Sequence, residues 1–300
     1  MTDFSGEIAA LSAACLWSIA SVVYSKLGLS IPPLQLNLIK GIIAIGFFVF
    51  TILITGELFS AIATLPMCLL LLSGVIGISL GDTLFFNAIN SLGPRRTLLM
   101  QTLTSPMSAI FGLIFLQEKL NSLAWCGILV TIFGVTWVIT ERTTDVINIS
   151  TKEFRQGIFF GLFSSIAGAT GAVLSRGAIA DTQISPLWAA LLRLSAGTLI
   201  LYIWSLSRQQ TNFRLSILQN PRIIGGTIFA SFFGTFLGIW LQQTAFKFTS
   251  VGIASTLLQT SPIFVIPFAI WMGEKVSRRA ISGVFISIAG IVLLFYPFSN

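Results

Sequence analysis

Apolar runs of about 20 residues repeat along the whole chain, separated by short stretches with glycine, proline or charge. A helical run of this length crosses the hydrocarbon core of a bilayer, which is about 30 Å thick. The pattern predicts ten helices, near residues 6–27, 34–55, 65–91, 95–117, 121–140, 157–179, 186–206, 222–247, 250–272 and 277–297. The expected fold class is an all-α polytopic membrane protein with ten transmembrane helices.

Short motifs return along the chain at a fixed offset. Gly77-x3-Gly81 with Ala88 returns 157 residues later as Gly234-x3-Gly238 with Ala245. Further pairs share an offset of 156 residues: Ser105-Pro106 with Ser261-Pro262, Glu118-Lys119 with Glu274-Lys275, Gly127 with Gly283, and Gly134 with Gly290. Because each copy holds an odd number of helices, the second copy must insert upside down. The ten helices are thus expected to form two inverted five-helix repeats, an architecture typical of secondary transporters.

The most polar stretch of the chain lies between the two copies. Residues 1–140 form the first predicted repeat and residues 157–300 the second. Residues 141–156 form a polar linker, which carries Glu141, Arg142, Asp145, Lys152, Glu153 and Arg155. No soluble domain is expected in either half.

Composition narrows the possible functions. Charged residues make up 9% of the chain, against about 25% in soluble domains. The absence of histidine removes the commonest metal ligand and general base, and the three cysteines have no metal-binding spacing. The basic residues behind the net charge of +7 are scattered through short loops, which argues against a nucleic-acid partner. Since no ATP-binding motif is found either, we expect no metal, no cofactor, no catalytic residue and no ATP, and no oligomer is required.

Asp82 is the one acidic residue predicted to lie well inside a helix. A charge at that depth costs about 2.5–3.5 kcal/mol, so the carboxylate should meet a partner or water. It shares a polar arc of the helix with Ser79, Thr83, Asn87 and Asn90. Lys40, at a similar predicted depth, is the natural partner. Two interpretations stay open: a permanent Asp82–Lys40 pair, or a titratable group or substrate contact at a cavity wall.

Arg193 occupies the position in the second half that Lys40 occupies in the first. The eighth predicted helix offers no matching acid, because Gly238 and Ile239 stand there, and Gln242 and Gln243 follow. Such an arginine can extend its long side chain to the membrane interface, or it can hold an anionic group such as a carboxylate. The sequence leaves both roles open.

The fourth predicted helix carries a polar stripe, and kinks are expected beside it. Thr97, Gln101, Thr104, Ser105 and Ser108 share one helical face, and the ninth helix repeats a shorter version with Ser255, Thr256 and Gln259. The stripe should face other helices or an aqueous path, because lipid cannot satisfy its hydrogen bonds. Prolines interrupt helical hydrogen bonding, so Pro106, Pro262 and Pro267 are candidates for gating or static kinks.

Several motifs together resemble a known family. They are Leu16-Trp17-Ser18, the basic residue after a proline in Pro33…Lys40 and Pro186…Arg193, the stretch Ala245…Thr249-Ser250-x-Gly252, and the Ser-Pro…Glu-Lys endings at 105–119 and 261–275. Over nearly its whole length the chain resembles two EamA-type repeats of the drug/metabolite transporter superfamily. The resemblance implies an exporter or permease for small metabolites, with a central cavity between the halves.

The resemblance and the polar stripes together select the pathway candidates. The cavity is expected between helices 1, 3, 4, 6, 8 and 9. The candidates are Trp17, Lys40, Asp82, Asn87, Gln101, Ser105, Arg193, Gln242 and Gln259. The second half departs from the first where Gly168-Ala169-Thr170-Gly171 stands near the position of the Trp17 stretch, so the halves contribute unequally if Trp17 lines the pathway.

The leading function is a secondary transporter of small metabolites, such as amino acids or related compounds, that works by alternating access, with proton coupling as an option. A lipid-carrier flippase of related architecture is the alternative. An integral membrane enzyme is disfavoured, because histidine, paired carboxylates within helices and a phosphate-binding glycine loop are all missing. The expected location is the cell (inner) membrane, with lipid and a small-molecule substrate as partners.

Charge counts predict an orientation. If the termini were cytoplasmic, that side would hold three basic residues, Lys119, Arg176 and Lys247. The other side would hold twelve: Lys26, Arg95, Arg96, Arg142, Lys152, Arg155, Arg208, Arg214, Arg222, Lys275, Arg278 and Arg279. Because short cytoplasmic loops are enriched in Lys and Arg, both termini are expected to face away from the cytoplasm, although relatives are usually drawn the other way.

Overall fold

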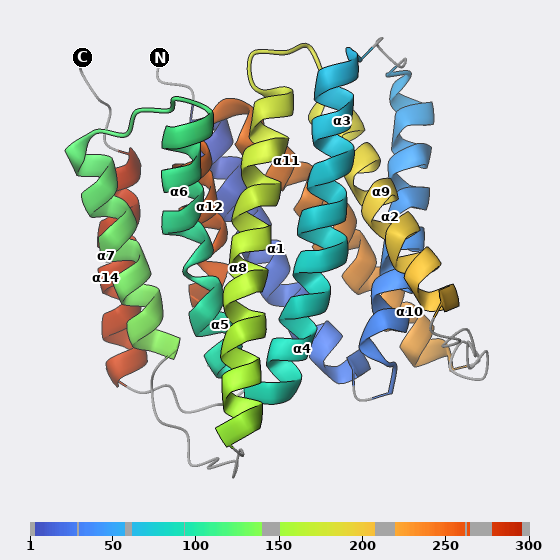
Figure 1. Cartoon of the computed structure of the whole chain (residues 1–300), viewed down its shortest axis with the longest axis horizontal. Coiled ribbons are helices and arrows are strands. Elements are labelled where there is room, and N and C mark those ends of the chain that lie inside the picture. Colours follow the sequence, from blue (N-terminus) through green and yellow to red (C-terminus); the bar gives the residue numbers. More distant parts are fainter. Residues whose placement is uncertain are drawn as a thin grey trace.

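The protein is a bundle of closely packed helices (Figure 1). We describe it from a computed structural model, which covers residues 4–28, 30–57, 62–92, 94–139, 151–207, 220–261, 263–264 and 278–295. Within these ranges the regular secondary structure is helical throughout, with no β-strand. The N- and C-termini lie at the same side of the bundle, which we call the terminus side (Figure 1).

The first half follows the predicted pattern closely. Its elements are α1 (Ser5–Gly28), α2 (Pro33–Thr55), α3 (Thr64–Ser73), η1 (Gly74–Gly81), α4 (Asp82–Leu92), α5 (Pro94–Gln101), α6 (Thr104–Phe115) and α7 (Ser122–Ile139). The elements α3, η1 and α4 form one continuous span, Thr64–Leu92. The fourth predicted helix is divided into α5 and α6 at Thr102 and Leu103.

The second half follows the same order of elements, with the counterpart of α6 largely outside the described residues. It contains α8 (Thr151–Ile179), α9 (Pro186–Ser207), α10 (Pro221–Ala230), η3 (Ser231–Leu237), α11 (Gly238–Phe248), α12 (Val251–Leu258) and α14 (Arg278–Phe295). The helix α8 begins earlier than predicted and takes in residues 151–156 of the expected linker. Most of the ninth predicted helix beyond α12, with Pro262 and Pro267, lies outside the described residues.

The apolar helices confirm the fold class of an all-α polytopic membrane protein. Six described helices are long and apolar enough to cross a membrane: Ser5–Gly28, Leu34–Thr55, Thr64–Leu92, Thr151–Ile179, Pro186–Ser207 and Pro221–Phe248. Three shorter apolar stretches, Thr104–Phe115, Ser122–Trp137 and Ile281–Leu294, belong to the other predicted spans. Large apolar side chains such as Leu53 (76% exposed), Phe115 (70%) and Phe285 (68%) lie on the outside, where lipid would meet them.

The third helix of each half widens into a π-helix at its glycine motif. In the first half η1 contains Gly77 and ends at Gly81, and in the second half η3 contains Gly234 and ends beside Gly238. A π-helix shifts the hydrogen bonds of the backbone to residues five apart, and such segments are frequent at functional sites. Both repeats therefore place the same irregularity at the same position.

Each π-helix receives side chains from the first helix of the other half. Trp17 of α1 donates its indole N–H to the carbonyl of Gly234 at 2.8 Å, and the Tyr24 hydroxyl is 2.9 Å from the carbonyl of Ala230. In the opposite direction, Ser164 of α8 donates to the carbonyl of Gly81 at 2.9 Å. Thus α1 packs along α10, η3 and α11, and α8 packs along α3, η1 and α4, so the halves interlock reciprocally.

The remaining helix pairs also join the first half to the second. α2 packs on α9, α6 on α12, and α7 on α14 at one edge of the bundle (Figure 1). The pairs α2–α9 and α7–α14 join equivalent elements of the two repeats, which is the arrangement that a two-fold relation between inverted halves produces.

Candidate functional site

Lys40 and Asp82 meet between α2 and α4. The Lys40 Nζ lies 3.6 Å from the Asp82 Oδ2. The ammonium also lies 5.6 Å from the centre of the Tyr24 ring and 6.0 Å from that of Phe86, within the range of cation–π attraction. The pair that the sequence suggested is therefore present.

The Asp82 side chain is nevertheless accessible. Its exposed fraction is 38%, against 18% for Lys40. Asp82 is the first residue of α4, well within the span Thr64–Leu92, where contact between a carboxylate and lipid is costly. Asn87 and Asn90 are exposed on the same helix, nearer its end. This polar surface leads from the ion pair toward the side of the bundle opposite the terminus side (Figure 1).

Arg193 lies deep in the bundle, on α9. Its exposed fraction is 5%, and its Nη1 donates to the Oε1 of Gln242 on α11 at 3.0 Å. Its Nε is buried and has no hydrogen-bond partner among the described residues. The guanidinium lies against Gly77 of η1, where an added Cβ would be 2.9 Å from Nη2. Arg193 therefore does not extend toward the membrane interface.

The three charges interact but do not cancel. The charges of Asp82 and Arg193 attract each other through space, while the ion pair of Asp82 is with Lys40. The ion pairs among the described residues are Lys40–Asp82 and Glu118–Arg176, so Arg193 belongs to neither. The cluster of Lys40, Asp82, Arg193 and Gln242, which we call the charge cluster, has two cationic side chains and one anionic one.

Trp17 contacts the glycine motif of the second half. Besides its hydrogen bond to Gly234, the indole covers Gly238, where a Cβ would lie 2.4 Å from the Trp17 Nε1. The ring thus fills the space between α1 and the span Pro221–Phe248. At the corresponding contact of α8 with η1 no large side chain intervenes, because a Cβ on Gly171 would lie 3.0 Å from the Cα of Gly77.

The polar stripe of the fourth predicted helix lies largely in contacts between helices. Gln101 donates to the Ser164 hydroxyl at 2.8 Å. Ser105 on α6 is fully buried and hydrogen-bonded to Thr256 on α12, which joins the two halves. Gln259 is half-buried, immediately after the end of α12.

Helix interruptions occur at nearly equivalent places in the two halves. The turn at Thr102 and Leu103 precedes Pro106, which lies in the first turn of α6, where its missing N–H costs little. In the second half a turn follows α12 at Gln259 and Thr260. Whether Pro262 and Pro267 bend the helix further lies outside the described residues.

Glu118 makes a connection between the two halves that the sequence did not indicate. The Glu118 Oε1 lies 2.6 Å from the Arg176 Nε, and its Oε2 accepts from the backbone N–H of Val251 at 2.8 Å. Arg176 also donates to the carbonyls of Phe246 and Lys247, at 2.8 Å and 2.6 Å. One ion pair therefore caps the end of α11 and the start of α12, and it ties the first half to the second on the terminus side.

A second cross-half contact lies on the same side. Thr249 donates its hydroxyl to the Glu7 carboxylate at 2.5 Å. We call this contact and the Glu118–Arg176 pair together the latch. The signal available in the sequence was the pair of matched glutamates, Glu118 and Glu274, but nothing in the sequence pointed to Arg176 as the partner.

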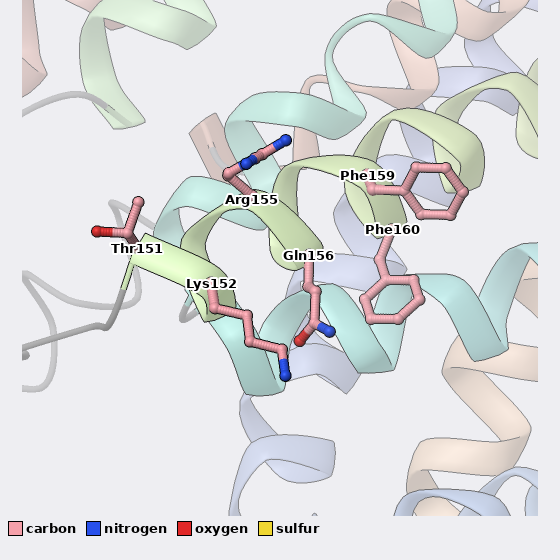
Figure 2. Close-up of a pocket in the computed structure, with 6 residues that line it drawn as sticks. All are labelled: Thr151, Lys152, Arg155, Gln156, Phe159 and Phe160. Atoms are coloured by element: carbon pink, nitrogen blue, oxygen red, sulfur yellow. The ribbon is translucent and has the colours of Figure 1, made fainter.

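A shallow hollow of about 640 Å³ lies at the start of α8, away from the charge cluster. Figure 2 shows Lys152 and Gln156 side by side along the helix, with Arg155 on another face and Phe159 and Phe160 one turn further on. All six lining residues belong to α8. This combination of exposed cations and aromatic rings suits a membrane–water boundary, and it does not form a closed binding site.

Comparison with known proteins establishes the family. The model of the EamA-like transporter family matches residues 4–140 and 155–296, so the chain belongs to this family. The uncharacterized transporter YyaM of Bacillus subtilis (strain 168) is 24% identical over 221 residues, covering 73% of this chain and 70% of YyaM. A solved crystal structure superposes with a TM-score of 0.80 at 15% identity, covering 98% of this chain and 97% of the other. The protein is therefore a multi-pass membrane transporter and not an enzyme.

Proposed function

We propose that this protein is a secondary transporter that moves small metabolites, such as amino acids or related compounds, by alternating access. The observation that carries the proposal is the charge cluster, which lies inside the bundle where the two halves meet. Polar and ionisable groups within membrane spans usually mark substrate or ion pathways. The cluster draws Lys40 and Asp82 from one half and Arg193 and Gln242 from the other, so a relative movement of the halves would change it.

The two sides of the bundle support alternating access. On the terminus side the latch ties the halves together. On the opposite side the exposed Asn87 and Asn90 continue the polar surface from Asp82. These two features support a transporter that is closed on the terminus side and open on the other. Opening of the latch is then the step that exposes the cluster to the second compartment.

The halves that move correspond to the predicted repeats 1–140 and 157–300, and residues 151–156 of the expected linker 141–156 belong to α8 and move with the second half. Four pathway candidates lie at or near the boundary between these halves, where they would line or adjust the pathway. They are Trp17, Gln101, Ser105 and Gln259. The turn at Thr102 and Leu103, just before Pro106, interrupts the α5–α6 span and is the candidate position for a bend. Asp82 is the candidate for proton coupling, because it is the acid that combines depth with an accessible side chain.

Uptake into proteoliposomes tests the function. Purified protein is reconstituted and offered a panel of radiolabelled amino acids, sugars and nucleobases, with and without a pH gradient. Saturable uptake of at least one compound, absent from protein-free liposomes, is the expected result. Stimulation by the gradient that disappears in Asp82→Asn would support proton coupling.

The flippase alternative is tested in the same vesicles. Fluorescent phospholipid and polyprenyl-phosphate probes are loaded, and their exposure is followed by dithionite quenching. Probe movement above the protein-free rate, without uptake of any soluble compound, would overturn the proposed metabolite transport in favour of lipid translocation.

A further inference from the structure

The charge cluster contains one more cation than anion. Building on the transport function proposed above, we propose that the cluster binds the carboxylate group of a small monoanionic or zwitterionic metabolite, and that Arg193 and Gln242 are the residues that hold it. The proposal assigns a substrate class to the site and separate roles to its two cations.

Of the two cations in the charge cluster, Arg193 is the one that is able to bind a further anion. Lys40 already has the Asp82 carboxylate 3.6 Å away and two aromatic rings near its ammonium. Arg193 has one neutral partner, Gln242, and its Nε has no partner among the described residues. A buried charge without a counterion is costly, and a bound anion would relieve that cost.

The partner of Arg193 completes the donor set. A guanidinium can only donate hydrogen bonds, so Gln242 must turn its carbonyl oxygen toward Nη1. The amide NH₂ of Gln242 is then left as a donor beside the guanidinium. A carboxylate has two oxygens that accept hydrogen bonds and pairs well with the planar fork of arginine.

The backbone next to Arg193 is unusually close. A Cβ added at Gly77 would lie 2.9 Å from the Arg193 Nη2, and one at Gly74 would lie 2.0 Å from the Arg193 carbonyl oxygen. Gly74 and Gly77 of η1 therefore allow α9 to pack against this span and leave the guanidinium inside the bundle. A larger residue at position 77 would displace the group that we assign to the anion.

The charge balance favours a carboxylate over a phosphate. Lys40, Arg193 and Asp82 sum to one positive charge, which a single carboxylate neutralises. A phosphate monoester carries about −1.5 to −2 charges at neutral pH, so its binding would leave an excess negative charge in the membrane interior. The proposed class is therefore small metabolites with one carboxylate, amino acids included.

Ligand-dependent thermal unfolding of the purified full-length protein tests the assignment. The probes are acetate, propionate, lactate and benzoate, each compared with its primary amide at constant ionic strength. The wild type is compared with Arg193→Gln, with Gln242→Glu and with the control Arg222→Gln. Arg222 is an exposed cation at the start of α10.

At least one carboxylate is expected to raise the unfolding temperature of the wild type and the control, while its amide does not. Arg193→Gln should weaken the binding of that carboxylate about 30-fold or more, which corresponds to about 2 kcal/mol of binding free energy. Gln242→Glu supplies a built-in carboxylate 3.0 Å from the Arg193 Nη1, so it should unfold no lower than the wild type and should not respond to the probes.

Equal stabilisation by acids and amides, no stabilisation by any acid, or an unchanged response in Gln242→Glu would each overturn the proposal. The Gln242→Glu result decides the matter if Arg193→Gln does not fold. Failure of the transport function is separate: it would appear as absent uptake in proteoliposomes, whatever the carboxylates do. Conversely, uptake confined to neutral or cationic compounds and unaffected by Arg193→Gln would keep the transporter and remove the carboxylate site.

Discussion

The two halves of the molecule share a scaffold but differ in how they treat one basic residue. In the first half Lys40 pairs with Asp82, which follows directly after η1. In the second half Arg193 has a neutral glutamine, and Gly238 follows η3. Helix order, π-helices and cross-half contacts are matched. The symmetric scaffold suits two alternating conformations, whereas the unmatched charges are the basis of the proposed binding site.

The packing around the two π-helices also differs between the halves. Trp17 separates α1 from Gly238, while Gly171 lets α8 touch Gly77 directly. Both interfaces contain side-chain hydrogen bonds, from Trp17 to Gly234 in the first and from Ser164 to Gly81 in the second, but only the Gly171 contact with Gly77 brings the two backbones together. Four predictions based on substitutions probe the two halves and their contacts, and a reporter fusion then tests which way the halves face.

The largest effect is expected from Gly74→Ala. The new Cβ would lie 2.0 Å from the backbone oxygen of Arg193, and a backbone atom cannot move aside as a side-chain end can. The free energy of unfolding should fall by about 3 kcal/mol or more. Fluorescence-detected size exclusion and thermal unfolding measure the loss. Gly225→Ala is the matched control, because nothing lies within 4 Å of its added Cβ. Equal yields and unfolding temperatures would contradict the close contact between η1 and α9.

Asp82→Asn should reduce transport about tenfold or more, a factor equivalent to about 1.4 kcal/mol, with a smaller effect on expression. The substitution removes the anion beside Lys40 and the acid proposed to take up a proton, so any pH dependence of uptake should flatten. Initial uptake rates between pH 5.5 and 8.5, taken as experimental settings, measure both effects, with Glu153→Gln, at an exposed position in the first turn of α8, as the control. Wild-type uptake at every pH would leave Asp82 without a role in transport.

The positions of the helices could be predicted from the sequence because apolar length and punctuation determine which segments span a membrane. The Lys40–Asp82 pair could be predicted as well, since two charges at similar depth need each other. The extension of α8 to Thr151 was missed, because Lys152, Glu153 and Arg155 resemble a linker by composition but are fully compatible with an exposed helical turn.

Contacts between segments far apart in the chain could not be predicted from the sequence. The π-helices leave no signal in hydrophobic periodicity, and the glycine motifs revealed close packing without indicating which helix approaches. Trp17 was expected along the pathway, whereas its indole N–H contact with Gly234 depends on how the two halves fit together. The partner of Glu118 was hidden for the same reason: Arg176 is 58 residues away in the other half.

A double-mutant cycle on Glu118→Gln and Arg176→Gln should give a coupling energy of about 1 kcal/mol or more. The two side chains are 16% and 17% exposed, so their pairing is less screened than that of a surface pair. Thermal unfolding of the wild type, the two single variants and the double variant gives this coupling energy. Additive effects would mean that the ion pair does not hold the terminus side together.

Trp17→Phe should have a smaller effect, about 0.5–1 kcal/mol, because the ring still fills the contact with Gly238 and only the N–H bond to the Gly234 carbonyl is lost. Trp17→Ala should cost clearly more, since it also empties the space between α1 and the second half. Thermal unfolding ranks the two variants. If they were equal, the role of the ring as a spacer, which distinguishes the first interface from the Gly171 contact, would be wrong.

The last prediction changes no residue and concerns which way the halves face. Three basic residues on the terminus side against twelve on the other place both termini, and the loop between α2 and α3, away from the cytoplasm. The surface that carries Asn87 and Asn90 would then open toward the cytoplasm, and the latch would close the outer side. A C-terminal reporter that fluoresces only in the cytoplasm should stay dark, while an alkaline phosphatase fusion at the same position should be active. Bright cells with an inactive phosphatase would reverse the orientation of both halves and turn the open side outward, with the charge cluster unchanged.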